Sequence, residues 1–341
     1  MKKTIALNLI IIFILFTLIE LIAARAFFYR NAVYHSFSTN WLIDGVAKVI
    51  DRKAAQNIGN TNKDFDLDRI FLYPESEIET KFRNYLVTRY EKTFQNVINQ
   101  ANKDGAEVLV FWTPTRKSLD KNLVYEDYFE QLAKKTGTNF LSMRDLLLEN
   151  EDYVFMLPYD DHLTRFSNHI IADRLTSFIN TNITYKRKGF NCSDITGSYN
   201  PNTSALWPVL PEIPYIMSTD EFGFRKTQQN SYDINNHNII ILGPSFTFGP
   251  YLSFYDTYPS ILSRQNKNWN VINAGVAGIG LESSESLLKK NSKCLNPAII
   301  VIQVVSADIK KSAVTEYNQN NFLGETLNIP DIEKSFYQSV Q

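Results

Sequence analysis

Ser245 follows a short apolar segment, in a position where its hydroxyl can act on another molecule. The residues Ile239-Ile-Ile-Leu lead into a Gly-Pro-Ser turn, and a second glycine follows at Gly249. An apolar run bounded by such a turn is typical of a buried strand in a parallel sheet. Open α/β sheets bind their ligands at the carboxyl ends of the strands, where Ser245 is expected to lie. An ordinary turn between a strand and a helix has the same pattern.

A serine hydroxyl becomes a nucleophile when a base lies within hydrogen-bond reach and a carboxylate orients that base. Among the four histidines only His162 directly follows an acidic pair, Asp160-Asp161. We therefore take His162 as the candidate base and Asp160 as its orienter, with Asp161 as the alternative. The remaining histidines fit structural or exposed positions better: His35, His169 and His237.

Two further strand ends offer groups that stabilise a developing negative charge. Backbone N–H groups at glycine turns supply such donors without side-chain obstruction. Gly275 follows the predicted strand 270–272, and Ser306-Ala-Asp308 follows the strongly apolar strand 297–305. No nucleotide, metal or haem pattern occurs in the sequence, so we expect no cofactor.

The hydrophobic pattern predicts the sheet that would bring these residues together. Apolar residues recur at helical spacing and alternate with strand-like runs, which indicates a parallel sheet covered by helices. The predicted strands are 107–112, 139–142, 239–242, 270–272 and 297–305, and the predicted helices are 77–102, 125–135, about 165–179, 256–264 and 281–290.

The blocks around these residues resemble the SGNH (GDSL-type) hydrolases. Gly243-Pro-Ser245 is similar to the family's first block, Asn273-Ala-Gly275 to its second, Ser306-Ala-Asp308 to its third, and Asp160-Asp-His162 to its last. The resemblance implies a flavodoxin-like three-layer α/β/α sandwich with a five-stranded parallel sheet. It also implies an esterase or acyltransferase acting on acyl groups of a glycan or lipid. Ser245 would then be the nucleophile, and the N–H groups of Ser245 and Gly275 would form the oxyanion hole.

The order of the blocks departs from the family, because the histidine block precedes the serine block. A circularly permuted single domain explains this order and is tolerated when natural termini lie close together. Two truncated halves of separate domains are the alternative, although each half alone would expose a raw sheet edge. The expected parts are an anchor (1–26), a juxtamembrane segment (27–69), a histidine-bearing part (70–185), a linker with short strands (186–237) and a serine-bearing part (238–341).

Two residues depart from the family pattern at the site itself. Pro244 replaces an aspartate, and Ala307 replaces an asparagine whose amide would be a third oxyanion donor. Losing one such donor typically lowers the rate by about 10²–10³. Ser306 is a possible substitute. These changes favour a second hypothesis, a non-catalytic envelope module that binds a glycan or a partner, while a degenerate gene product is a third.

Composition and the N-terminal region indicate where in the cell the protein is located and which partners it has. After Met1-Lys-Lys, an apolar run from Ile5 to Ile19 continues beyond Glu20 as Leu21-Ile-Ala-Ala24, long enough to span a bilayer with the body exported. We favour an uncleaved anchor over a signal peptide cut after Ala26. The net charge of −1 argues against nucleic acid as a partner. Two cysteines, Cys192 and Cys294, are too few for a disulfide framework and lack the spacing of metal ligands. Whether they pair with each other is left open.

Overall fold

Five parallel strands form one sheet at the centre of the protein. The computed structural model describes residues 71–309, with gaps at 72, 76, 120–122, 158–159, 187–188, 208–214, 228–231 and 278–279. The strands are β1 (Glu107–Trp112), β2 (Asn139–Ser142), β7 (His237–Leu242), β8 (Trp269–Asn273) and β9 (Ile299–Val304). They pair in parallel in the order β2-β1-β9-β7-β8. The predicted five-stranded parallel α/β sheet is therefore confirmed.

The strand order is that of a doubly wound sheet read from a different starting point. If β7 is counted first, β8, β9, β1 and β2 follow as second to fifth, and the sheet reads 2-1-3-4-5. This is the flavodoxin-like order, which places ligands at the carboxyl ends of the first and third strands, where the order reverses. Those strands are β7 and β9, and the serines that follow them are Ser245 and Ser306.

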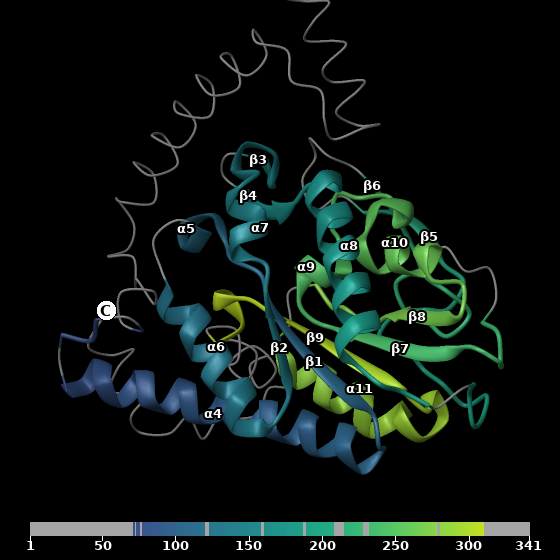
Figure 1. Cartoon of the computed structure of the whole chain (residues 1–341), viewed down its shortest axis with the longest axis horizontal. Coiled ribbons are helices and arrows are strands. Elements are labelled where there is room, and N and C mark those ends of the chain that lie inside the picture. Colours follow the sequence, from purple (N-terminus) through teal and green to yellow (C-terminus); the bar gives the residue numbers. More distant parts are fainter. Residues whose placement is uncertain are drawn as a thin grey trace, which may run out of the picture.

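Helices cover both faces of the sheet, which makes three layers (Figure 1). One face carries α4 (Glu77–Lys103), α6 (Leu123–Thr136) and α11 (Leu281–Leu295), and the other carries α8 (Arg165–Asn182) and α10 (Tyr258–Gln265). Successive side chains of a strand point to opposite faces of the sheet. Ile240 therefore packs in the apolar cluster on the α4 side, and Ile241 packs in the cluster on the α8 side. Burial on both faces explains why the strands read as continuous apolar runs.

The segment predicted as a linker adds a hairpin and protects one edge of the sheet. Antiparallel strands β5 (Ser204–Trp207) and β6 (Tyr215–Ser218) form a separate two-stranded sheet. Further along, Arg225 forms an antiparallel bridge with Asn273, and Thr227 Oγ1 donates to the Val271 carbonyl oxygen at 3.1 Å. These contacts lie along the open edge of β8, where an unpaired strand would otherwise invite pairing with another chain.

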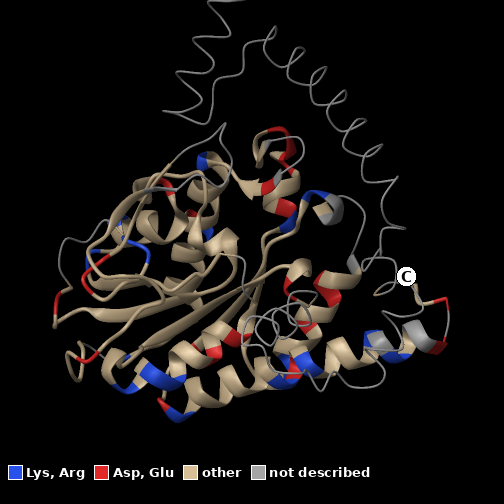
Figure 2. Ribbon diagram, turned by 180° about the vertical axis from the view of Figure 1, so that it is seen from behind, with Lys and Arg blue, Asp and Glu red and all other residues tan. Residues whose placement is uncertain are grey.

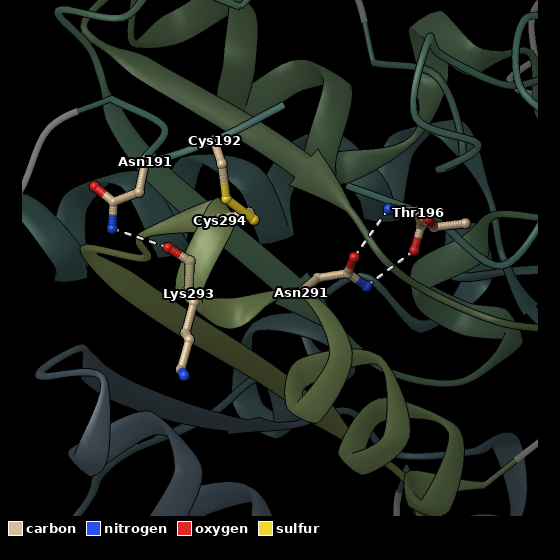
Figure 3. Close-up of a disulfide and its surroundings, with 6 residues drawn as sticks. All are labelled: Asn191, Cys192, Thr196, Asn291, Lys293 and Cys294. Carbon is tan, nitrogen blue, oxygen red and sulfur yellow. Dashed lines mark hydrogen bonds between the residues drawn. A yellow bond between two sulfur atoms is a disulfide. The ribbon is translucent and has the colours of Figure 1, made fainter. Parts of the chain in front are cut away.

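Cys192 and Cys294 are joined in a disulfide that ties this segment to the end of α11 (Figure 3). The Asn191 N–H donates to the Cys294 carbonyl oxygen at 2.9 Å, beside the bridge. Farther along, the Asn291 side chain forms two hydrogen bonds of 2.9 Å with the Thr196 backbone. The sequence left the pairing open, because two cysteines 102 residues apart give no sign of proximity.

The described residues include neither the predicted membrane anchor nor the segment that follows it. No helix in the described part has the length and apolar character needed to cross a membrane. The predicted anchor at 1–26 and the juxtamembrane segment at 27–69 lie outside the described residues. Positively and negatively charged residues are interspersed along the helices on the α4 side of the sheet (Figure 2).

Candidate functional site

The structure brings Ser245 and His162 into direct contact. Nε2 of His162 lies 2.9 Å from Oγ of Ser245, although the two residues are 83 positions apart. This distance is within the range that proton transfer from a serine nucleophile to a base requires. Ser245 is 9% exposed, so its hydroxyl lies at the boundary between the interior and the surface.

Close backbone packing places Ser245 at the end of β7. Ser245 begins the short helix α9 (Ser245–Phe248), and the carbonyl oxygen of Pro244 accepts hydrogen bonds from the N–H groups of Thr247 and Phe248. A Cβ on Gly243 would overlap Oγ1 of Thr247, and a Cβ on Gly275 would lie 2.6 Å from the Phe248 nitrogen. Glycine is therefore required at both positions because α9 approaches the backbone so closely.

A buried polar network lies directly beneath this turn. Thr247 Oγ1 donates to Oε1 of Gln303 at 2.6 Å, and Nε2 of Gln303 donates to Oγ1 of Thr113 at 2.8 Å. Since the Thr247 proton is used in this way, the Tyr258 hydroxyl donates to Thr247 Oγ1 at 2.9 Å. Burial raises the pKa of Tyr258, so the group remains a neutral donor. Three strands or helices are thus connected to the serine turn by satisfied hydrogen bonds.

Sequence reasoning missed this network, although one signal for it exists. Gln303 is the single polar residue inside the apolar strand β9. A polar side chain in a strand buried on both faces must find partners in the interior. It therefore marks a point where that strand is tied to its neighbours.

His162 is held by a small hairpin at the start of α8. It lies on β4 (Asp160–Leu163), which pairs antiparallel with β3 (Phe155–Leu157), a hairpin that was not predicted from the sequence. Thr164 caps α8, because its Oγ1 accepts the Ser167 N–H at 3.2 Å and donates to the Tyr153 carbonyl oxygen at 2.5 Å.

Asn168 joins the histidine side of the site to the serine side. Its Nδ2 donates to the Thr164 carbonyl oxygen at 2.8 Å, and its Oδ1 accepts the N–H of Tyr258, also at 2.8 Å. Tyr258 belongs to the network under Ser245. One buried amide therefore links α8, which follows His162, to α10, which follows the serine turn.

The acidic candidates are found in different settings. Asp161 Oδ1 accepts the Arg116 N–H at 3.2 Å, on the exposed surface next to α5 (Arg116–Leu119). Asp161 is adjacent to His162 on a strand, so the two side chains point to opposite faces. The side chain of Asp160 lies outside the described part. Asp308 is buried and its Oδ2 accepts the Val305 N–H at 2.9 Å, which fixes the turn after β9.

The candidate oxyanion donors differ in their present bonding. The Gly275 N–H donates to Oδ1 of Asn273 at 3.1 Å, and the Asn273 amide donates to the Thr247 carbonyl oxygen at 3.1 Å. The Ser245 N–H makes no hydrogen bond with the described residues. Ser306 is buried at the end of β9, and the neighbouring Ala307 packs partly against the apolar cluster on the α8 side.

Aromatic rings surround the imidazole of His162. Phe246 lies 5.5 Å away between ring centroids, and Tyr251 lies 5.4 Å away with its plane nearly perpendicular. Tyr251 has a backbone φ of +65°, a left-handed conformation that a bulky residue rarely adopts. Such a conformation costs about 1–3 kcal/mol, and residues that retain it are concentrated at functional sites. Neither aromatic contact was predicted from the sequence.

Comparisons with known proteins give a distant likeness in fold. The sequence matches no protein-family model and no curated protein. The O-acetyltransferase domain of Pseudomonas putida AlgJ is 13% identical, with a TM-score of 0.44, over 66% of this chain and 84% of that one. Pseudomonas aeruginosa AlgX is 16% identical, with a TM-score of 0.40, over 66% of this chain and 58% of that one. At these values neither likeness bears on the chemistry of the site.

Proposed function

We propose that this protein is an SGNH-type serine esterase or acyltransferase that acts on the acyl groups of a glycan or lipid. The observation that carries the proposal is the 2.9 Å contact between His162 Nε2 and Ser245 Oγ. The flavodoxin-like strand order supports it too, since both serine-bearing strand ends flank the reversal point. In this proposal the chain is a permuted single domain, because its two parts contribute strands to one sheet.

Each residue has a defined task in the proposed reaction. His162 takes the proton of Ser245 as the hydroxyl oxygen attacks the ester carbon, and later returns that proton to the leaving alcohol. Asp160 orients the imidazole, since residues two apart on a strand share a face and Asp161 is turned to Arg116. Water or a sugar hydroxyl then accepts the acyl group from Ser245.

The oxyanion hole of the proposed enzyme is weak. The Ser245 N–H is available to a developing oxyanion, whereas the Gly275 N–H must first leave Asn273 Oδ1 or share its proton. Ala307 has no side-chain amide that could donate to the oxyanion. We therefore expect slow turnover compared with enzymes that have three free donors, because each lost donor typically lowers the rate by about 10²–10³.

The second candidate function is an envelope module that binds a glycan or partner without catalysis. The occupied Gly275 N–H and the residues Pro244 and Ala307 favour it. Both candidates place the folded part outside the cytoplasm, anchored by residues 1–26. The Cys192–Cys294 disulfide supports this location, because disulfides persist mainly in oxidising compartments.

A serine-reactive phosphonate distinguishes the two functions. We expect the full chain to form an adduct on Ser245, located by peptide mass spectrometry. The adduct should be absent in Ser245→Ala and at least tenfold slower to form in His162→Ala. Ser253→Ala and His169→Ala are the matched controls and should label like the parent, since Ser253 lies on an exposed loop and His169 on α8. A folded protein that forms no adduct contradicts the enzyme and favours the binding module.

A further inference from the structure

Arg225 is a fully buried cation close to the helix that begins at Ser245. Its side chain has no exposed surface and forms no ion pair with the described residues. Its Nη2 donates to the Leu252 carbonyl oxygen at 2.9 Å and its Nη1 to that of Ile216 at 3.5 Å, while Nε has no acceptor among the residues that the structure describes. Burial lowers the pKa of Arg225 to about 10, so it remains charged at neutral pH. Its two hydrogen bonds go to backbone carbonyl oxygens on separate segments, so the guanidinium ties those segments together.

Arg225 contacts residues that come before and after Tyr251 along the chain, Phe248 and Leu252. The guanidinium carbon lies 5.1 Å from the ring centroid of Phe248, the last residue of the helix that begins at Ser245. The carbonyl oxygen that it binds belongs to Leu252, which directly follows Tyr251. The guanidinium also lies 5.6 Å from the Tyr215 ring, which packs against Tyr251 at 6.1 Å.

Tyr251 in turn contacts the imidazole of His162. Its ring lies at 80° to the imidazole with 5.4 Å between centroids, while Phe246 packs against the imidazole at 5.5 Å. Rotation of the imidazole would move Nε2 away from Ser245 Oγ. The left-handed backbone at Tyr251 persists only where the surroundings hold it. Arg225 supplies two of those restraints, the contact with the Phe248 ring and the hydrogen bond to the Leu252 carbonyl oxygen.

We propose that Arg225 is a positioning residue for His162, which it orients by fixing the ring of Tyr251 against the imidazole. The proposal rests on the proposed function, since the orientation matters for the reaction only if His162 removes the Ser245 proton. Arg225 itself touches neither His162 nor Ser245 in the contacts described above. Its effect passes through Phe248 and Leu252 to Tyr251.

The test separates positioning from stability with Arg225→Met in the full chain. Methionine keeps most of the volume but loses the hydrogen bonds and the cation–ring contacts. We expect a moderately lower Tm, because the Leu252 and Ile216 carbonyl oxygens lose their donor. Beyond that loss of stability, we expect at least a tenfold slower phosphonate reaction at Ser245 and a shifted or broadened His162 ring signal in NMR. That signal is assigned by its loss in His162→Gln. A folded Arg225→Met protein with the parent's labelling rate and His162 signal overturns the proposal.

A second set of variants keeps the proposal falsifiable if Arg225→Met does not fold. Asparagine tolerates a left-handed backbone, so Tyr251→Asn removes the ring with little change in backbone preference. We expect Tyr251→Asn to slow labelling of Ser245 and to shift the His162 signal. Tyr251→Phe, which keeps the ring, should match the parent in both measurements. Tyr255→Ala, which removes an exposed ring from the same region, is the control and should match the parent. Equal behaviour of Tyr251→Asn and the parent overturns the proposal.

The NMR signal also separates this proposal from the proposed function. If the parent protein forms no phosphonate adduct, the enzyme assignment fails. A His162 signal that changes in Arg225→Met would still support positioning of the imidazole. A His162 signal that does not change would overturn positioning even in a protein that labels well.

Discussion

The two sides of the Ser245–His162 contact are held in different ways. The serine turn is built into the interior, where two glycines permit close packing and a buried network joins it to β1, β9 and α10. The histidine is carried by a hairpin of two short strands outside the main sheet. The core of the fold therefore fixes Ser245, whereas contacts at its periphery fix His162. Changes on the serine side should affect stability and site together, and changes on the histidine side should affect the site more.

The strongest test of this contrast is Gln303→Leu. Leucine leaves the hydroxyls of Thr247 and Thr113 without their partner in the interior, which costs about 1–3 kcal/mol. We expect the free energy of unfolding to fall by that amount, measured by urea denaturation, together with slower labelling of Ser245. Gln131→Leu makes the same change at an exposed position of α6 and should leave both close to the parent values. A large loss of stability with unaltered labelling would break the link between the network and the serine turn.

A smaller effect is expected on the histidine side from Thr164→Ala. The change removes the cap of α8 and the hydrogen bond to the Tyr153 carbonyl oxygen, for a loss of about 0.5–2 kcal/mol. We expect labelling of Ser245 to slow more than the small loss of stability implies, because the hairpin that carries His162 loosens. Thr181→Ala, at an exposed position in the last turn of α8, is the control. Equal effects on both measurements in the two variants would remove the contrast between the regions.

The smallest expected effect is a pH dependence from His169. Burial lowers the pKa of His169, and the nearby Arg165 and Arg264 lower it further. The folded state then disfavours the proton that the unfolded chain accepts. This contribution to stability is therefore present above the unfolded pKa and is lost as pH falls below it and through the lower folded pKa. We expect Tm to fall slightly less between pH 7 and pH 5 in His169→Gln than in the parent. Identical slopes would show that His169 is indifferent to folding.

The sheet was predictable because its strands are buried on both faces and read as continuous apolar runs. Strands 107–112 and 139–142 match the structure, and the remaining three differ from it by two residues at most at either end. The Ser245–His162 contact was foreseen through a family pattern and not through spacing, since 83 residues separate the pair. The short β3–β4 hairpin escaped prediction, because strands of three or four residues have too few positions for a period to show.

Residues that act through distant contacts escaped prediction as well. Arg225 and Tyr251 look like ordinary loop residues in the sequence, and their roles arise from the rings that tertiary packing brings around them. The disulfide was equally invisible, since Cys192 and Cys294 lie 102 residues apart. A left-handed tyrosine has no sequence signature, because the strain is imposed by neighbours that are distant along the chain.

The strand order has a consequence for how the chain acquires its structure. β1 pairs with β2 on one side and with β9 on the other, and Thr113 and Gln303 at the ends of β1 and β9 are 190 residues apart. A chain made from its N-terminus therefore carries β1 with one edge unsatisfied until almost the whole described part has emerged. Long-range pairing of this kind slows folding and leaves a strand open to association in the meantime. We expect nascent chains that stop before β9 to depend on a chaperone that shields this edge.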